Sequence, residues 1–277
     1  MKKVLMKTFS KTIMMPLVLV LFFSLNSCGE NKKKANEDNQ EESKEMKEAS
    51  TTSANNELSE KEKEDGWKLL FDGESTDGWR GYGKDDFPDR GWVVENGTLK
   101  LNGSGAGEAG GAGDIIYDGQ FKDFELSLEW KISEGGNSGI LYLAQEIEGQ
   151  PIWKSAPEMQ ILDNEKHPDA KLGKDGNRKA GSLYDLIPAD PQNAKPAGEW
   201  NTVSIMVYRG TVVHSMNGEN VVEYHLWTDD WKNMIAESKF AGWEDFINAG
   251  GEDHKGYIGL QDHGDDVWFR NIKIKEL

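Results

Sequence analysis

The sequence has a single cysteine among its 277 residues, so the chain cannot form an internal disulfide and a folded domain must rely on its apolar core. Histidines are also few: there are 5, none in a His-x-x-x-His pair, and no zinc-binding motif can be recognised. Basic residues number 32 against 49 acidic ones. The resulting net charge of −17 argues against a nucleic-acid-binding protein, because phosphates require a basic surface.

Long apolar runs are equally scarce. The one near the start, residues 13–23, is shorter than the roughly 20 residues of a membrane-spanning helix. It follows a start with four lysines, as in an export signal. Residues 25–28, Leu-Asn-Ser-Cys, resemble a bacterial lipobox, which implies cleavage before Cys28 and lipid attachment there. We expect residues 1–27 to be a lipoprotein signal peptide; the alternative is an ordinary secreted protein with a free thiol.

The next segment, residues 28–64, consists mainly of Glu, Lys, Asn and Ser and has almost no apolar residues. Such a composition cannot bury enough surface to offset the entropy of ordering the chain. We therefore expect the lipidated Cys28 to be followed by a disordered, charged tether that holds a domain away from a membrane. The expected location is the outer membrane of the cell envelope, on either the periplasmic face or the cell surface.

Residues 65–277 are long enough for one domain with a sizeable core. Residues 123–132 alternate between polar and apolar side chains, which predicts a long strand with one buried face. The pairs Asn96-Gly97 and Asn217-Gly218 predict tight hairpin turns. Many short strands of this kind, with one or two helical turns within residues 228–246, predict an all-β fold of two packed antiparallel sheets.

The central stretch of residues 158–163 predicts a ligand site. As a strand, it places Glu158 and Gln160 on one face, while Met159 and Ile161 point into the core. Asp163 follows directly. A buried strand rarely carries Glu and Gln unless they are paired or face a cleft. The strand is therefore a candidate floor for a binding site; the alternative is a half-exposed strand with solvated side chains.

A second candidate is the run of residues 259–264, where Gln261 and His263 share a face between two glycines. Histidine titrates near neutral pH, so His263 is a candidate general acid or base, although a structural histidine is the alternative. Arg270 lies on the next predicted strand, and its guanidinium is a candidate clamp for hydroxyl groups or a carboxylate.

Other residues leave two interpretations open. Tyr184 brings a phenol near this polar cluster, or has a half-buried ring bonded to the backbone. His214 on a strand is more typical of a structural histidine. Trp200 is more typical of a core residue than of a sugar platform. The sequence has 10 tryptophans and does not separate core rings from rings that line a groove.

Taken together, these motifs resemble the 3-keto-disaccharide hydrolase family, formerly a domain of unknown function and common among lipoproteins of Bacteroidetes. The resemblance covers about residues 66–277. It rests on motifs in the expected order: Trp67 with Phe71-Asp72-Gly73 and Gly78-Trp79, Asp123-Phe124-Glu125-Leu126, Gly136-Asn137-Ser138-Gly139-Ile140, Glu158 to Asp163, Gly181-Ser182-Leu183-Tyr184, Glu199-Trp200-Asn201, Asn217-Gly218, Gly259 to Gly264 and Phe269-Arg270-Asn271-Ile272. It implies a jelly-roll sandwich of the concanavalin A-like type. It also implies cleavage of glycosides that a separate oxidoreductase has oxidised at C3.

The implied chemistry needs a base rather than a pair of spaced carboxylates. A ketone at C3 acidifies the proton on C2, and the resulting enolate can expel the glycosidic oxygen from C1. We expect His263 to be the base, with Glu158 as the next candidate and Tyr184 as a proton donor. The expected substrate-binding residues are Asn137, Gln160, Asp163, Trp200, Gln261 and Arg270.

Two alternatives differ in class. A conventional β-glucanase on this fold carries two or three alternating acids, whereas Gln160 stands where the second acid would be. A non-catalytic sugar-binding module would need aromatic platforms and no base. No cofactor is expected, although a calcium site in aspartate-rich loops stays open.

Overall fold

The computed structural model describes residues 55–107 and 111–277. The predicted signal peptide, Cys28 and most of the predicted tether lie outside these residues. Within the described part of the chain, no helix has the length and apolar character needed to cross a membrane.

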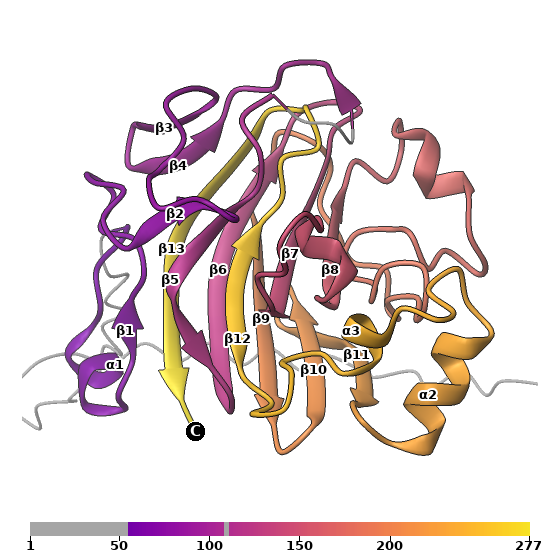
Figure 1. The fold of residues 1–277 in the computed structure, drawn as a ribbon. Coiled ribbons are helices and arrows are strands. Elements are labelled where there is room, and N and C mark those ends of the chain that lie inside the picture. The colour runs from indigo at the N-terminus through magenta and orange to yellow at the C-terminus, as the bar shows by residue number, and fades with distance from the viewer. Residues whose placement is uncertain (1–54, 108–110) are drawn as a thin grey trace, which may run out of the picture. The chain divides into compact units, whose positions relative to one another are not determined.

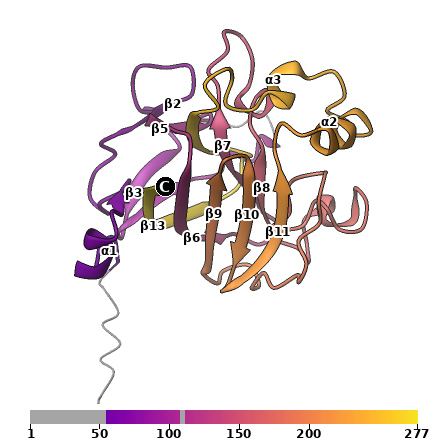
Figure 2. The same ribbon diagram turned by 90° about the horizontal axis from the view of Figure 1, so that it is seen from below.

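Two antiparallel sheets pack against each other and make up most of the domain (Figures 1 and 2). The larger sheet has the order β11 (Glu219–His225), β10 (Thr211–Met216), β9 (Asn201–Tyr208), β6 (Phe124–Ile132), β13 (Val267–Glu276), β4 (Thr98–Leu101) and β3 (Trp92–Glu95), with β1 (Lys68–Leu69) also paired to β13. The smaller sheet has the order β2 (Trp79–Gly81), β5 (Ile115–Phe121), β12 (Gly256–Leu260), β7 (Asn137–Ala144) and β8 (Glu158–Leu162). The predicted two-sheet, all-β sandwich is confirmed.

Alternation along β6 builds one wall of the core. Every second side chain from Phe124 to Ile132 is buried, while the residues between them are only half-buried. Asn96 and Gly97 both have positive φ, 52° and 71°, as the predicted hairpin turn between β3 and β4 requires. In contrast, β7 and β8 are buried at every position, so this edge of the smaller sheet is covered on both faces.

Short helical segments lie beside the two sheets: η2 (Ile152–Lys154) contacts β7, α3 (Glu244–Ile247) contacts η2, and α2 (Asp229–Ala236) contacts α3 and β11 (Figure 1). A further 3-10 helix, η3 (Pro168–Lys171), follows β8 in the chain. Thr228 caps α2 by accepting a hydrogen bond from the Trp231 N–H. Trp231 in turn stacks on Phe246 at 5.7 Å and fixes α3 against α2. The helical turns predicted for residues 228–246 are therefore confirmed.

The predicted disorder of residues 28–64 is wrong for its last ten residues, 55–64. Asn56 is buried, donates from its backbone N–H to Asn271 Oδ1 (2.6 Å), and donates from Nδ2 to the Gly97 carbonyl (2.9 Å). The short helix α1 (Glu60–Glu64) begins with a capping box between Ser59 and Glu62. The folded domain thus includes residues 55–64, which pair with loops and strands far away in the sequence.

Candidate active site

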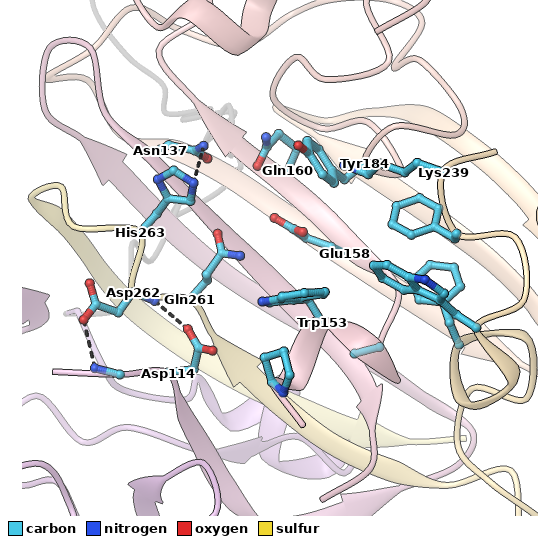
Figure 3. A pocket seen from close by; sticks show the side chains of 16 residues that line it. Asp114, Asn137, Trp153, Glu158, Gln160, Tyr184, Lys239, Gln261, Asp262 and His263 are labelled. Atoms are coloured by element: carbon cyan, nitrogen blue, oxygen red, sulfur yellow. Dashed lines mark hydrogen bonds between the residues drawn. The ribbon is translucent and has the colours of Figure 1, made fainter. Parts of the chain in front are cut away.

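A pocket of about 390 Å³ lies on the outer face of the smaller sheet (Figure 3). Its floor is β8, from which Glu158 and Gln160 point into it, as predicted. One side, here called the polar end, is lined by Asn137, Gln261 and His263 together with Asp114 and Asp262. The opposite side, the aromatic end, is lined by Trp153, Phe240, Trp243 and Phe246. Glu158 lies between the two ends (Figure 3).

Glycine at position 139 makes room for the Glu158 carboxylate. Strand β7 pairs with β8 so that Gly139 lies opposite Gln160 and Leu141 opposite Glu158. A Cβ atom at position 139 would lie 2.1 Å from Glu158 Oε1, far inside contact distance. Any side chain at this position would therefore displace the carboxylate from the pocket floor.

Polar atoms without partners concentrate at the polar end. Of four buried side-chain polar atoms without a hydrogen-bond partner in the described part of the chain, three belong to Asn137 (Oδ1), Gln261 (Oε1) and His263 (Nδ1). An unpaired buried polar atom costs roughly 1–3 kcal/mol. Three such residues in one pocket are typical of a site that a polar ligand completes.

His263 is held from two sides. Asn137 Nδ2 lies 3.2 Å from its Nε2, and the ring of His167 meets it edge-on at 6.1 Å. Burial lowers the pKa of His167, which is therefore neutral near pH 7. His167 Nδ1 accepts the Asp169 N–H (3.2 Å), so its ring proton lies on Nε2.

His167, His263 and Asp265 form the one group of three potential metal ligands within residues 55–107 and 111–277, with donor atoms within 4.8 Å of one another. A protonated Nε2 on His167 has no lone pair for a metal, and imidazoles are poor calcium ligands. We therefore assign no metal to this group. The expected absence of a cofactor stays a prediction.

Asp114 supplies a carboxyl group with a raised pKa at the polar end. Its Oδ1 accepts the Asp262 N–H (2.8 Å), while the Asp262 carboxylate accepts backbone N–H groups of Ala112, Gly113 and Gly264 at 2.8 to 2.9 Å. Burial, reinforced by the nearby charge of Asp262, raises the pKa of Asp114 to about 7. The raised pKa keeps this carboxyl group protonated to a higher pH than an ordinary aspartate, so that it can donate a proton.

Tyr184 and Lys239 line the wall near the aromatic end. The Tyr184 hydroxyl donates to Asp169 Oδ2 (3.0 Å), so its proton already has an acceptor within the protein. Lys239 Nζ lies 4.1 Å from the centre of the Tyr184 ring and 3.5 Å from Asp185 Oδ2. Burial lowers the pKa of Lys239. Tyr184 thus contributes its ring to the pocket, and its predicted role as proton donor to a ligand is not supported by this geometry.

Comparison with known proteins places this site in a family. Residues 66–275 match the model of the 3-keto-alpha-glucoside-1,2-lyase-like domain. The chain belongs to this family. A relative from Bacteroides thetaiotaomicron, named 3-keto-disaccharide hydrolase, is 58% identical over 230 residues, which are 77% of this chain and 79% of the relative. The predicted family resemblance is confirmed.

Two solved structures are similar to this chain in sequence and fold. A crystal structure from Parabacteroides distasonis, provisionally described as a glycosyl hydrolase, is 31% identical with a TM-score of 0.70 and covers 81% of this chain and 100% of its own. A second structure from the same organism, described in the same way, is 27% identical with a TM-score of 0.60 and covers 76% and 99%.

Three residues that we expected to bind substrate lie elsewhere. Arg270 binds Glu129 Oε2 through Nε (2.9 Å) and Nη2 (2.7 Å) and stacks over Trp200 at 4.0 Å, on the outer face of the larger sheet. Asp163 accepts backbone N–H groups of three neighbouring residues and holds a turn. The predictions for Arg270, Trp200 and Asp163 are therefore wrong.

His214, by contrast, is structural, as expected from the sequence. It is fully buried and bonded to the Tyr142 hydroxyl (2.8 Å) and the Gly181 carbonyl (3.1 Å). Burial lowers its pKa to about 4. It lies outside the pocket of this 3-keto-alpha-glucoside-1,2-lyase-like domain.

Sequence analysis missed Asp114, Trp153, Lys239 and Trp243. Asp114 ends the glycine-rich stretch and directly precedes β5, and a carboxylate at the start of a strand is a signal that could have been used. Trp153 lies in a three-residue 3-10 helix, and Lys239 and Trp243 lie between α2 and α3. Nothing in the local pattern of these three residues distinguishes a pocket wall from an ordinary surface turn.

Proposed function

We propose that this protein cleaves the glycosidic bond of sugars that already carry a ketone at C3. The observation that carries the proposal is the pocket, where Glu158, His263 and a carboxyl group with a pKa of about 7 line one cavity with amide side chains. Membership of the 3-keto-alpha-glucoside-1,2-lyase-like family and the 58% identical relative named 3-keto-disaccharide hydrolase support it.

The reaction begins with removal of the C2 proton, which the neighbouring C3 ketone acidifies. The electron pair forms an enolate, the C1–O bond breaks, and the leaving oxygen takes a proton. Water then adds to the unsaturated sugar at C1, and a proton returns to C2. This route does not require the two carboxylates at fixed separation that ordinary glycosidases use. Gln160 in place of a second acid on β8 is compatible with it.

Position in the pocket favours Glu158 over His263 as the base, which reverses the order expected from the sequence. The hydroxyl groups and ketone of the oxidised ring fit the polar end, so the leaving group extends toward the aromatic end. In this orientation the C1–C2 bond would lie over Glu158, whose side chain is between the two ends (Figure 3). His263 at the polar end is placed to donate to the ketone oxygen as charge develops on it.

Asp114 is our candidate for the proton donor to the leaving oxygen. It directly precedes β5, which β12 and β7 separate from β8 in the same sheet, and its raised pKa matches that of an acid working near neutral pH. Asn137, Gln160 and Gln261 orient the sugar through their amides.

Two further parts of the proposal concern the cellular context. A lipid on Cys28 would anchor the protein at the cell envelope, at the outer membrane. The substrate requires a prior oxidation of a hydroxyl group to a ketone at C3, so a separate glycoside 3-oxidoreductase must supply it.

The test offers purified protein a 3-keto-glucoside and the parent glucoside side by side. Cleavage of the keto form alone is the expected result. Cleavage of the parent glucoside would instead indicate a conventional glucanase. Binding of either sugar without turnover would indicate a non-catalytic module, and both outcomes would overturn the proposal.

A further inference from the structure

A second cavity of about 770 Å³, here called the hollow, lies beside the pocket. It is lined by residues 81–90 and by Ala112, Gly113 and Asp114. Gly113 and Asp114 also line the pocket, so the two cavities meet at these residues. Residues 112–114 therefore form a wall that the pocket and the hollow share.

The lining of the hollow suits water better than a sugar. Residues 83–86 and 89–90 are exposed and carry charges of both signs. Its two aromatic rings are engaged elsewhere, because the Tyr82 hydroxyl donates to the Gln145 carbonyl (2.9 Å) and Phe87 packs against the main apolar core. Ligand pockets are lined predominantly by apolar and aromatic side chains, whereas this lining is polar and hydrated.

Hydrogen bonds on both sides hold the shared wall in place. The Asp262 carboxylate accepts the N–H groups of Ala112 (2.8 Å) and Gly113 (2.9 Å). On the side of the hollow, the Asp114 carbonyl accepts the Tyr82 N–H (2.8 Å). The Asp114 side chain lines the pocket (Figure 3). Asp114 is therefore fixed between the two cavities, with its carboxyl group on the side of the substrate.

Gly113 leaves space for water in this wall. A Cβ atom at position 113 would meet no atom within 4 Å, although the residue borders both cavities. Its φ of +86° is one that glycine adopts readily and other residues rarely do. Water can therefore move from the hollow toward Asp114 beside Gly113 without displacing a side chain.

The proposed reaction needs a water molecule while its pocket is filled. The oxidised ring and its leaving group occupy the pocket, of about 390 Å³, when the C1–O bond breaks. A filled site excludes bulk water. The water that adds to C1 must then come by another route, and the hollow reaches Asp114 from outside the pocket.

We propose that the hollow supplies the water that adds to C1, and that Asp114 acts twice, first as the acid and then as the base. The inference rests on the proposed function and deepens it. In the first half of the reaction, Glu158 takes the C2 proton, the C1–O bond breaks, and Asp114 gives its proton to the leaving oxygen. In the second half, the water oxygen bonds to C1 while a water proton passes to Asp114, and Glu158 returns its proton to C2. Both carboxyl groups regain their starting protonation, and water is the only other reactant.

This inference predicts which product leaves the enzyme. Delivery of water gives the hydrated 3-keto sugar, whereas elimination without hydration releases an unsaturated 2-hydroxy-enone. Only the enone has a conjugated C=C–C=O system, so ultraviolet absorbance distinguishes the two products. Their ratio therefore measures hydration separately from elimination.

The first test uses Asp114→Asn. Release of nitrophenolate from 4-nitrophenyl 3-keto-glucoside should stay within about twofold of the wild type, because this leaving group does not need an acid. Hydration of the enone, supplied directly as a substrate, should fall by about 10²-fold, because asparagine cannot take a proton from water. Hydration of the enone at the wild-type rate would show that Asp114 is not the base and would overturn the inference.

The second test closes the space at Gly113. Gly113→Leu should place a side chain between the hollow and Asp114 and raise the share of enone in the product several-fold, while exchange of the C2 proton with solvent is retained. Gly198→Leu is the matched control, because Gly198 has the same φ of +86°, has no atom within 4 Å of an added Cβ and lines neither cavity. It introduces the same backbone strain and should keep the wild-type ratio of products.

Three further results would overturn the inference. They are a wild-type enzyme that releases mainly the enone, an unchanged product ratio in Gly113→Leu, and an equal change in Gly198→Leu. If Gly113→Leu does not fold, hydration of the enone by Asp114→Asn decides the question. Failure of the wild type to cleave any 3-keto compound would count against the proposed function, whereas cleavage with unaltered hydration in both variants would count against this inference alone.

Discussion

The outer faces of the two sheets each carry a glutamate on an alternating strand, but the two glutamates differ in burial. On the larger sheet, Glu129 on β6 alternates with core residues and pairs with Arg270 at a partly exposed surface. On the smaller sheet, Glu158 on β8 also alternates with core residues, yet it is buried. The difference is that the segment around Tyr184 pairs with β8 and, with Trp153 of η2 and Phe246 of α3, lines the same pocket as Glu158, whereas Glu129 stays partly exposed. An acid on an alternating strand thus becomes a site residue only when later parts of the chain enclose it.

Glu158→Gln should give the largest effect. If Glu158 is the base, kcat on a 3-keto-glucoside should fall by about 10²–10⁴, because a positioned base contributes that much. Exchange of the C2 proton with deuterated solvent, followed by NMR, should fall with it. Glu129→Gln is the matched control on the other sheet and should stay within about twofold of the wild type. If Glu158→Gln retained C2 exchange, another residue would have to be the base.

Gly139→Ala on the neighbouring strand β7 should displace the Glu158 side chain on the pocket floor. The added methyl group overlaps Glu158 Oε1 and must push it aside, so kcat should fall by about 10- to 100-fold. Gly119→Ala on β5, where the nearest atom is 3.2 Å away on the Tyr117 side chain, serves as a comparison. Circular dichroism and thermal unfolding should show that both variants fold. Full activity in Gly139→Ala would contradict the assigned position of the carboxylate.

Asp114→Asn should change stability and activity in opposite directions. Because burial raises the pKa of Asp114 to about 7, the folded state holds its proton more tightly than the unfolded state, with its usual pKa near 3.8. That stabilisation is complete below pH 3.8 and is lost as the pH rises toward 7. Above pH 7 the asparagine variant should therefore be more stable to urea by about 1–2 kcal/mol, a value reduced for partial solvent exposure.

The same substitution should lower kcat by about 10²-fold if Asp114 is the acid. In the wild type, kcat/KM should fall as the pH rises through about 7, as Asp114 loses its proton. The decline should be absent from the residual activity of Asp114→Asn. A variant that keeps both full activity and the wild-type pH profile would remove Asp114 from the mechanism.

Arg270→Ala should give the smallest effect. Its pair with Glu129 is about one-fifth exposed on each side, so we expect a loss of about 1 kcal/mol or less in the free energy of unfolding. Activity should stay within about twofold of the wild type, measured on the same 3-keto-glucoside. A tenfold loss of activity would mean that the outer face of the larger sheet takes part in the reaction.

Periodicity predicted the parts of the site that belong to strands. The alternation of Glu158 and Gln160 with core residues on β8 placed both in the pocket. Gln261 and His263 also line it, but they follow the end of β12, and Asp262 between them lines the pocket as well, so their position does not rest on alternation. Arg270 was misplaced because β12 and β13 are consecutive in sequence but belong to different sheets. A period of two predicts which face of its strand a side chain points to. It does not predict which sheet the next strand joins.

Other features lacked a local signal. Strand β5 was not predicted, because Asp118, Gly119 and Gln120 interrupt its apolar pattern. The aromatic end arises from η2 and α3, which meet only in the folded chain. Residues 55–64 are ordered through hydrogen bonds to Gly97 and Asn271 rather than through apolar burial. Such long-range contacts cannot be read from composition.

The contacts of Asn56 fix where the chain enters the domain. Asn56 joins Asn271 on β13 of the larger sheet, while the pocket opens on the outer face of the other sheet. Residues 55–64 therefore contact the domain on the side of the larger sheet, whereas the pocket belongs to the smaller one. A glycoside can approach the pocket from the outer face of the smaller sheet without meeting this segment.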